Sequence, residues 1–178
     1  MIKTGCIVVT GGAGFIGSAV VRQLLELTDY RVVNVDALTY AGNVATISDV
    51  MQSPRHEFVH ADIIDGSRMR QLFEKNQPLA LIHLAAESHV DRSIDGPGVF
   101  ITSNIVGTYT LLEEARRYVA ESGSEAAAQF RFHHVSTDEV FGSLSLDDPA
   151  FTPETYSLFM SLSSKCSLRT FIDISFRW

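Results

Sequence analysis

The chain has 178 residues, of which 46% are hydrophobic and 20% are charged, and its formal net charge is −7 at pH 7. This composition is typical of a globular domain with a hydrophobic core, and the negative charge argues against a nucleic-acid partner or an anionic membrane surface. No apolar run approaches the roughly 20 residues of a membrane span, and Cys6 and Cys166 make no disulfide framework, so we expect a cytoplasmic protein.

Short apolar runs alternate with helical patterns along the chain. The segments with the composition of buried strands are 6–10, 31–36, 57–62, 80–86 and 130–136. The segments with helical spacing are 15–27, 67–76 and 99–118, and 122–129 has the composition of a linker. This alternation predicts an α/β fold, a Rossmann-like doubly wound parallel sheet. Ligands bind at the carboxyl ends of the strands in such sheets, so the loops after the strands are the candidate site.

The first of these loops is rich in glycine. It reads "TGGAGFIG", with Gly11, Gly14 and Gly17 spaced by three between a predicted strand and a predicted helix. These glycines allow a pyrophosphate to approach the backbone, and the start of the helix attracts the anion. Asp36 ends the second strand and would accept hydrogen bonds from an adenosine ribose; no Arg or Lys follows it closely, which favours NAD over NADP. The alternative is a packing turn followed by a turn-forming aspartate.

The segments after the third and fourth predicted strands add candidate contacts to the cofactor. Asp62 is placed to accept from the exocyclic amine of adenine, and Ile63 is placed to lie against the ring. The alternative for Asp62 is a plain turn or helix-cap residue. The fourth strand ends with two small residues, Ala85 and Ala86, where the backbone can pass close to a cofactor.

Two adjacent carboxylates, Asp138 and Glu139, follow the fifth predicted strand behind the hydroxyl of Thr137. Close carboxylates tend to separate their pKa values, so that one stays protonated, and this pattern predicts acid–base chemistry. The alternative is a solvated loop. His83 is expected to be a satisfied core residue, and no histidine has the spacing of a metal ligand, so no metal site is predicted.

Several motifs together resemble the extended short-chain dehydrogenase/reductases. They are "TGGAGFIG", "DALTYAGN", "HLAAESHVDRSI", "SNIVGTYTLLE" and "STDEVFG", and they occur in family order from residue 5 to about residue 154. The last motif is similar to that of the dTDP-glucose 4,6-dehydratases, whereas related epimerases and decarboxylases of nucleotide sugars, the alternative, usually carry other residues there. The resemblance implies a hydro-lyase that uses NAD, takes dTDP-glucose as its substrate and forms a homodimer through the helix at 99–118.

The resemblance also implies roles for single residues. NAD would contact a set of residues in the loops: Phe15, Ile16, Asp36, Ala37, Leu38, Thr39, Asp62, Ile63, Leu84, Ala85, Ala86, Glu87, Ser88 and Ser103. Ser88, His89 and Thr137 would contact the sugar nucleotide. Hydride would pass from the sugar C4 to NAD, and Glu139 as general base would remove the C5 proton. Asp138 as general acid would protonate the departing C6 hydroxyl, and hydride would return to C6.

The C-terminal tail departs from the family pattern. The family oxidises its substrate with a Tyr-x-x-x-Lys pair, and neither Tyr156 nor Lys165 has its partner at that spacing. We therefore predict an NAD-binding domain at 1–154 and an atypical tail at 155–178, with a sheet that is incomplete at its C-terminal end. We hypothesise a reading-frame change or a degraded gene, and we expect impaired activity. The alternative is a non-catalytic NAD-binding or dimerising fragment.

Overall fold

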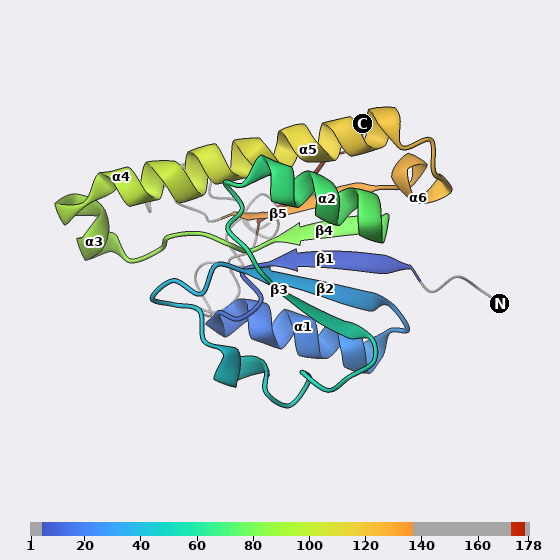
Figure 1. Ribbon diagram of the computed structural model, residues 1–178. Helices are drawn as coiled ribbons and strands as arrows, with labels where there is room; N and C mark the ends of the chain where they lie inside the picture. The colour runs from blue at the N-terminus through green and yellow to red at the C-terminus, as the bar shows by residue number, and fades with distance from the viewer. Residues whose placement is uncertain (1–4, 137–171, 177–178) are drawn as a thin grey trace, which may run out of the picture. The chain divides into compact units, whose positions relative to one another are not determined.

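The computed structural model describes residues 5–136 and 172–176, the latter by their backbone as strand β6 (Ile172–Phe176). The chain separates into two compact units, of which the first comprises Met1–Phe132 with Phe176–Trp178 and the second His133–Ser175. The elements that position the candidate site belong to the first unit (Figure 1).

A parallel sheet forms the centre of the first unit. Its strands lie in the order β3 (His56–His60), β2 (Arg31–Asp36), β1 (Cys6–Thr10) and β4 (Ala80–His83). Strand β5 (Arg131–Ser136) begins beside β4, where the Arg131 N–H donates to the Leu79 carbonyl at 3.0 Å. Because β1 pairs with β2 on one side and β4 on the other, the winding of the sheet reverses at β1. Ligand sites in doubly wound sheets lie at such reversals.

Helices cover both faces of this sheet (Figure 1). Helix α1 (Phe15–Leu27) lies on one face, and α2 (Gly66–Asn76) and α5 (Thr108–Glu121) lie together on the other. Side chains alternate along each strand, so Val32 packs in the cluster under α1 while Val33 packs in the cluster under α2 and α5. The predicted doubly wound arrangement is therefore confirmed.

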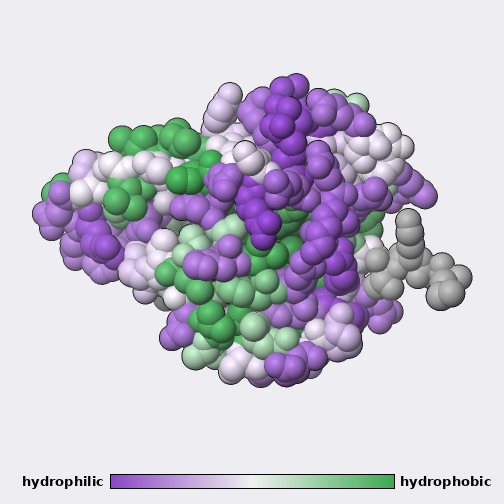
Figure 2. All heavy atoms as spheres, viewed as in Figure 1, coloured by the Kyte–Doolittle hydropathy of each residue, from purple (hydrophilic) through white to green (hydrophobic). Residues whose placement is uncertain are grey.

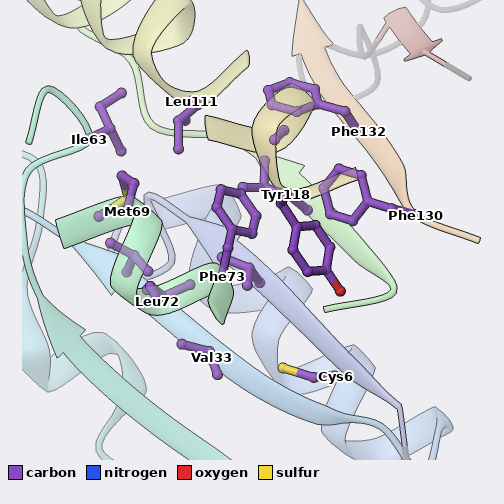
Figure 3. Close-up of a cluster of buried hydrophobic side chains, with 14 of the residues drawn as sticks. Cys6, Val33, Ile63, Met69, Leu72, Phe73, Leu111, Tyr118, Phe130 and Phe132 are labelled. Carbon is purple, nitrogen blue, oxygen red and sulfur yellow. The ribbon is translucent and has the colours of Figure 1, made fainter. Parts of the chain in front are cut away.

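Three aromatic rings pack together in the larger cluster, under α2 and α5 (Figure 3). The rings of Phe73 and Tyr118 stack with centroids 5.5 Å apart, and Phe130 meets both edge-on at 5.8 and 5.5 Å. The Tyr118 hydroxyl donates to the Pro78 carbonyl at 3.1 Å, which satisfies its polar end inside the core. Cys6 is buried at 4% exposure, and burial raises the pKa of its thiol.

An ion pair joins α2 to α5 beside this cluster. Two guanidinium nitrogens of Arg70 donate to the two carboxylate oxygens of Glu114, each at 2.9 Å, and Arg117 lies 3.7 Å from the same carboxylate. The hydrogen bonds from Arg70 lower the pKa of Glu114. The forked geometry fixes the two helices relative to each other as well as balancing charge.

Several boundaries predicted from the sequence are wrong. Strand β3 ends at His60, two residues earlier than predicted, and β4 ends at His83, three residues earlier. The expected linker contains a short helix, α6 (Glu125–Ala128), because the Ser124 hydroxyl accepts from the Ala127 N–H at 3.1 Å and caps the turn. Ala127 is buried, so tertiary packing decides the structure of this polar stretch.

The helix predicted at 99–118 is longer and less regular than expected. It starts with α4 (Pro97–Phe100), widens into a π-helix (Ile101–Gly107) and continues as α5. Helix α3 (Val90–Asp95) and a 3₁₀ turn (Val44–Ile47) were not predicted. Within the described segments, no helix combines the length and the hydropathy that crossing a bilayer requires.

Candidate functional site

The glycine turn lies at the carboxyl end of β1. Gly11 has a φ of 73°, in the left-handed region that glycine adopts without strain, and its N–H donates to the Val35 carbonyl at 2.8 Å. A side chain here would lie 2.7 Å from the Ala85 nitrogen. A side chain at Gly17 would overlap the Gly11 carbonyl. The turn is therefore pressed between α1 and the segment after β4.

The first turn of α1 presents backbone donors at this rim. Gly14 is its N-cap and supplies no capping side chain. Phe15 and Ile16 begin the helix with side chains that are 78% and 37% exposed. N–H groups in a first turn have no acceptor within the helix, and the helix dipole adds partial positive charge there. The turn therefore has the chemistry of an anion site, and its contact with a pyrophosphate stays a prediction.

Asp36 connects the glycine turn to the loop after β2. It is 8% exposed, and its two carboxylate oxygens accept from the Ala13 N–H at 2.9 Å and the Leu38 N–H at 2.8 Å. Ala37, between Asp36 and Leu38 in the chain, is half-buried. Each carboxylate oxygen has a second lone pair, so Asp36 is still able to accept from hydroxyl groups. The sequence analysis did not predict that Asp36 holds the glycine turn and the loop after β2 together.

The loop after β2, residues 37–43, is fixed at its base. Leu38 has a φ of 52°, the Gly42 N–H donates to the Thr39 carbonyl at 3.1 Å, and the Asn43 N–H donates to the Ala13 carbonyl at 3.1 Å. Thr39 is exposed. Both ends of the loop therefore depend on the glycine turn.

Asp62 and Ile63 follow β3 and have different environments. The exposed carboxylate of Asp62 accepts from the Ile64 N–H at 3.1 Å, and its carbonyl accepts from the Asp65 N–H at 3.1 Å, which makes a turn. Ile63 is 5% exposed and packs against Gly107, where an added side chain would come within 2.6 Å of it. Their contacts to adenine stay a prediction, and Asp62 already has the turn role that was the alternative.

The segment after β4, residues 84–89, passes over the glycine turn. The N–H groups of Leu84 and Ala85 donate to the Thr10 carbonyl at 3.1 Å and to the Thr10 hydroxyl at 3.4 Å. Leu84 and Ala85 are half-buried. Ala86, Ser88 and His89 are exposed. The predicted contacts to cofactor and substrate thus follow one another along a single extended segment.

Asn104, in the π-helix, holds this segment in place. Its amide oxygen accepts from the Glu87 N–H at 2.8 Å, and its amide nitrogen donates to the Glu87 carbonyl at 2.9 Å. Glu87 is 8% exposed, and Ser103, the predicted cofactor contact, is half-buried beside Asn104. The sequence analysis missed this role, although an amide among apolar residues of a helical segment was a signal.

His83 is a core residue, as predicted. It is 1% exposed, its Nδ1 lies 2.7 Å from the Thr10 hydroxyl and its Nε2 lies 2.9 Å from the Thr108 hydroxyl. The imidazole meets the ring of Phe132 edge-on at 6.1 Å. It therefore links β1, β4 and α5 beneath the rim.

The structure brings the glycine turn, Asp36 and the 84–89 segment to the carboxyl end of the sheet (Figure 1). Thr137, Asp138 and Glu139 lie outside the described residues, as does most of the tail at 155–178. Across residues 5–136, the side chains form no cluster of three or more potential metal ligands.

Comparison of sequences identifies relatives of the chain. The sequence profile of the GDP-mannose 4,6 dehydratase family matches residues 8–158. The dTDP-glucose 4,6-dehydratase of Salmonella typhimurium is 56% identical over 153 residues, and dTDP-glucose 4,6-dehydratase 1 of Escherichia coli is 57% identical over 153 residues. Each match covers 86% of this chain and 42% of the relative, so the chain spans less than half the length of these curated relatives.

Solved structures show the same fold. The dTDP-glucose 4,6-dehydratase of Bacillus anthracis in complex with NAD gives a TM-score of 0.68 at 35% identity, over 85% of this chain and 43% of that chain. DesIV, the dTDP-glucose 4,6-dehydratase of Streptomyces venezuelae with NAD and TYD bound, gives a TM-score of 0.68 at 46% identity. The match covers 79% of this chain and 42% of DesIV. These likenesses confirm the Rossmann-like fold. Since the family profile covers most of its length, the chain belongs to the GDP-mannose 4,6 dehydratase family.

Proposed function

We propose that the chain binds NAD along the carboxyl rim of its sheet and acts on dTDP-glucose as a 4,6-dehydratase. One observation carries the cofactor part: the glycine turn and the loop after β2 are locked together by Asp36 beside the uncapped start of α1. The names of the relatives support the substrate and the reaction. The dehydratase structures that contain NAD support the cofactor.

The residues at the rim fit the parts of NAD. Its pyrophosphate would lie on the backbone of Gly11 and the first turn of α1, whose N-cap residue, Gly14, carries no side chain. The free lone pairs of Asp36 would accept from the adenosine ribose hydroxyls. A 2′-phosphate would meet the same carboxylate, and the residues that follow, Ala37, Leu38 and Thr39, offer no positive charge. This arrangement supports NAD over NADP.

In the proposed reaction the chain's side chains move protons and orient the sugar. NAD, when bound, would accept hydride from C4 and return it to C6. The C4 hydroxyl proton would pass to water, because the chain has no Tyr-x-x-x-Lys pair to take it, so we expect impaired turnover. Glu139 would remove the C5 proton, and Asp138 would protonate the leaving C6 hydroxyl. The sugar nucleotide would be positioned by Ser88, His89 and Thr137. Ser88 and His89 are exposed at the end of the 84–89 segment, directly before α3.

A second candidate function is NAD binding without catalysis. The observation that favours it is the missing Tyr-x-x-x-Lys pair around Tyr156 and Lys165, because the pair would be needed to deprotonate the C4 hydroxyl. In that case the site would still bind NAD, and conversion of dTDP-glucose would be lost.

Calorimetric titration of the purified chain with NAD⁺ and NADP⁺ tests the cofactor assignment. We expect saturable binding of NAD⁺, at least tenfold weaker binding of NADP⁺, and loss of NAD⁺ binding in Gly17→Ala. Incubation with dTDP-glucose and NAD⁺, followed by detection of a 4-keto sugar nucleotide, then separates the two candidates. Failure to bind NAD⁺ would overturn both, and binding without product would leave only the second.

We propose homodimerisation through the helical run at 97–121. Large apolar side chains are exposed along this run and the adjoining α3: Ile94, Val99, Ile101, Ile105, Val106 and Tyr109. Figure 2 shows this apolar surface over the α4 end of the run. Sizing with light scattering should give a dimer that Ile105→Lys dissociates. The control Leu27→Lys, at another exposed residue, in α1, should preserve the dimer. A cytoplasmic location, without nucleic-acid or membrane partners, stays a prediction of the sequence.

A further inference from the structure

A contact between two loops crosses the carboxyl end of β1. The guanidinium carbon of Arg92, in α3, lies 4.2 Å from the centre of the Tyr40 ring, in the loop after β2. Arg92 follows β4, and β2 and β4 are separated by β1 in the sheet. The pair therefore spans the strand that carries the glycine turn, and both elements lie at the end toward which the strand arrows point (Figure 1).

Each partner is attached to a part of the rim that has its own fixed base. On one side Asp36 and Asn43 tie the Tyr40 loop to the glycine turn. On the other side the Ser93 N–H donates to the His89 carbonyl at 3.2 Å, and Asn104 holds Glu87. Hydrogen bonds therefore fix the chain on each side of the ring–guanidinium contact.

We propose that Tyr40 and Arg92 form a clasp that couples the cofactor side of the rim to the substrate side. The loop that carries Tyr40 includes Leu38 and Thr39, which the proposed function assigns to NAD. The segment that leads to Arg92 includes Ser88 and His89, which it assigns to the sugar nucleotide. When NAD orders the first loop, the clasp also orders the second segment. Both are positioning residues, and the inference rests on the proposed function.

The magnitude follows from the exposure of the contact. Tyr40 is 49% exposed, so the contact is hydrated on one side. A cation–π pair in such a place changes an equilibrium by about two- to fivefold. Loss of the pair should weaken NAD⁺ binding by at most that factor, because part of the interaction is already present in the unbound chain. The effect should depend on the Tyr40 ring and the Arg92 charge and be independent of the Tyr40 hydroxyl.

The experiment is a double-mutant cycle on the full chain, read by amide hydrogen exchange and by NAD⁺ titration. The variants are Tyr40→Leu, Arg92→Gln and the double mutant, with Tyr40→Phe as the matched control that keeps the ring. We expect faster exchange in residues 37–43 and 86–95 of the unbound single mutants, with no further increase in the double mutant. Tyr40→Phe should behave as the wild type, because it retains the aromatic face.

With NAD⁺ present, the wild type and Tyr40→Phe should protect both loops, whereas Tyr40→Leu should protect the glycine turn and lose protection at 86–95. Additive effects in the cycle, or a Tyr40→Phe that matches Tyr40→Leu, would overturn the clasp. If NAD⁺ protected no part of the wild type, the proposed function would fail. Hydrogen exchange in the double-mutant cycle without NAD⁺ would then still decide whether the clasp exists.

Discussion

Replacing Asp36 tests whether one carboxylate holds the rim together. Asp36→Ala removes both acceptors from the Ala13 and Leu38 N–H groups and leaves these donors near the buried end of β2. Hydrogen bonds to a charged group contribute about 1.5–3 kcal/mol each, which gives about 3–6 kcal/mol for the pair. Leu38 is only half-buried, so water replaces part of the loss, and we expect about 3 kcal/mol.

Thermal unfolding followed by circular dichroism measures this loss. For a chain of 178 residues, about 3 kcal/mol corresponds to a decrease in Tm of roughly 6–12 °C. Asp36→Asn keeps the shape and retains one carbonyl acceptor, so its Tm should fall about half as far. Asp29→Ala, at an exposed aspartate just after α1, is the control and should stay within about 1 °C of the wild type.

The reasoning is refuted if Asp36→Ala melts within about 1 °C of the wild type, because the two hydrogen bonds would then contribute nothing to stability. It is also refuted if Asp36→Asn and Asp36→Ala lose the same amount, because that result would point to charge rather than to the two acceptors. Urea unfolding should rank the variants in the same order, with an unchanged m-value.

Three further outcomes follow from the packing. In urea unfolding, Gly17→Ala should lower the free energy of unfolding by about 1–3 kcal/mol, because its methyl group overlaps the glycine turn. Gly98→Ala, whose methyl group has no neighbour within 4 Å, should raise it by up to about 1 kcal/mol. Tyr118→Phe should cost about 1 kcal/mol by the same assay, and no change would mean that its buried hydrogen bond is dispensable. The ion pair with Arg70 lowers the pKa of Glu114, so the contribution of the pair to stability is complete above the ordinary value of 4.5 and disappears as the pH falls through the lowered pKa. Glu114→Gln should flatten this part of the stability–pH curve. An unchanged curve would contradict the assignment.

The central strands and α1 were predictable because local pattern and burial agree there. All five residues of β1 are buried, so the strand reads as an unbroken apolar run, and the glycine spacing that follows has one common structural meaning. Asp36 was also placed correctly at the end of β2, although its hydrogen bonds to Ala13 and Leu38 depend on three-dimensional closure and leave no trace in the sequence.

The rest was hidden because tertiary contacts decide it. The π-helix changes the helical period at Ile101–Gly107, so a search for the regular period gives one straight helix. Helix α3 is too short to show periodicity. Tyr40 and Arg92 are far apart in the chain, and only the order of β2, β1 and β4 brings them within reach of each other.

The amide of Asn104 substitutes for a neighbouring strand. Beyond His83 the chain has left the sheet, yet Glu87 still finds a donor and an acceptor placed as another backbone would place them. Aspartate and leucine have the right size, but neither carries both groups. We therefore expect that position to tolerate almost no exchange, and a substitution there should release the main chain at Glu87 from both of these hydrogen bonds.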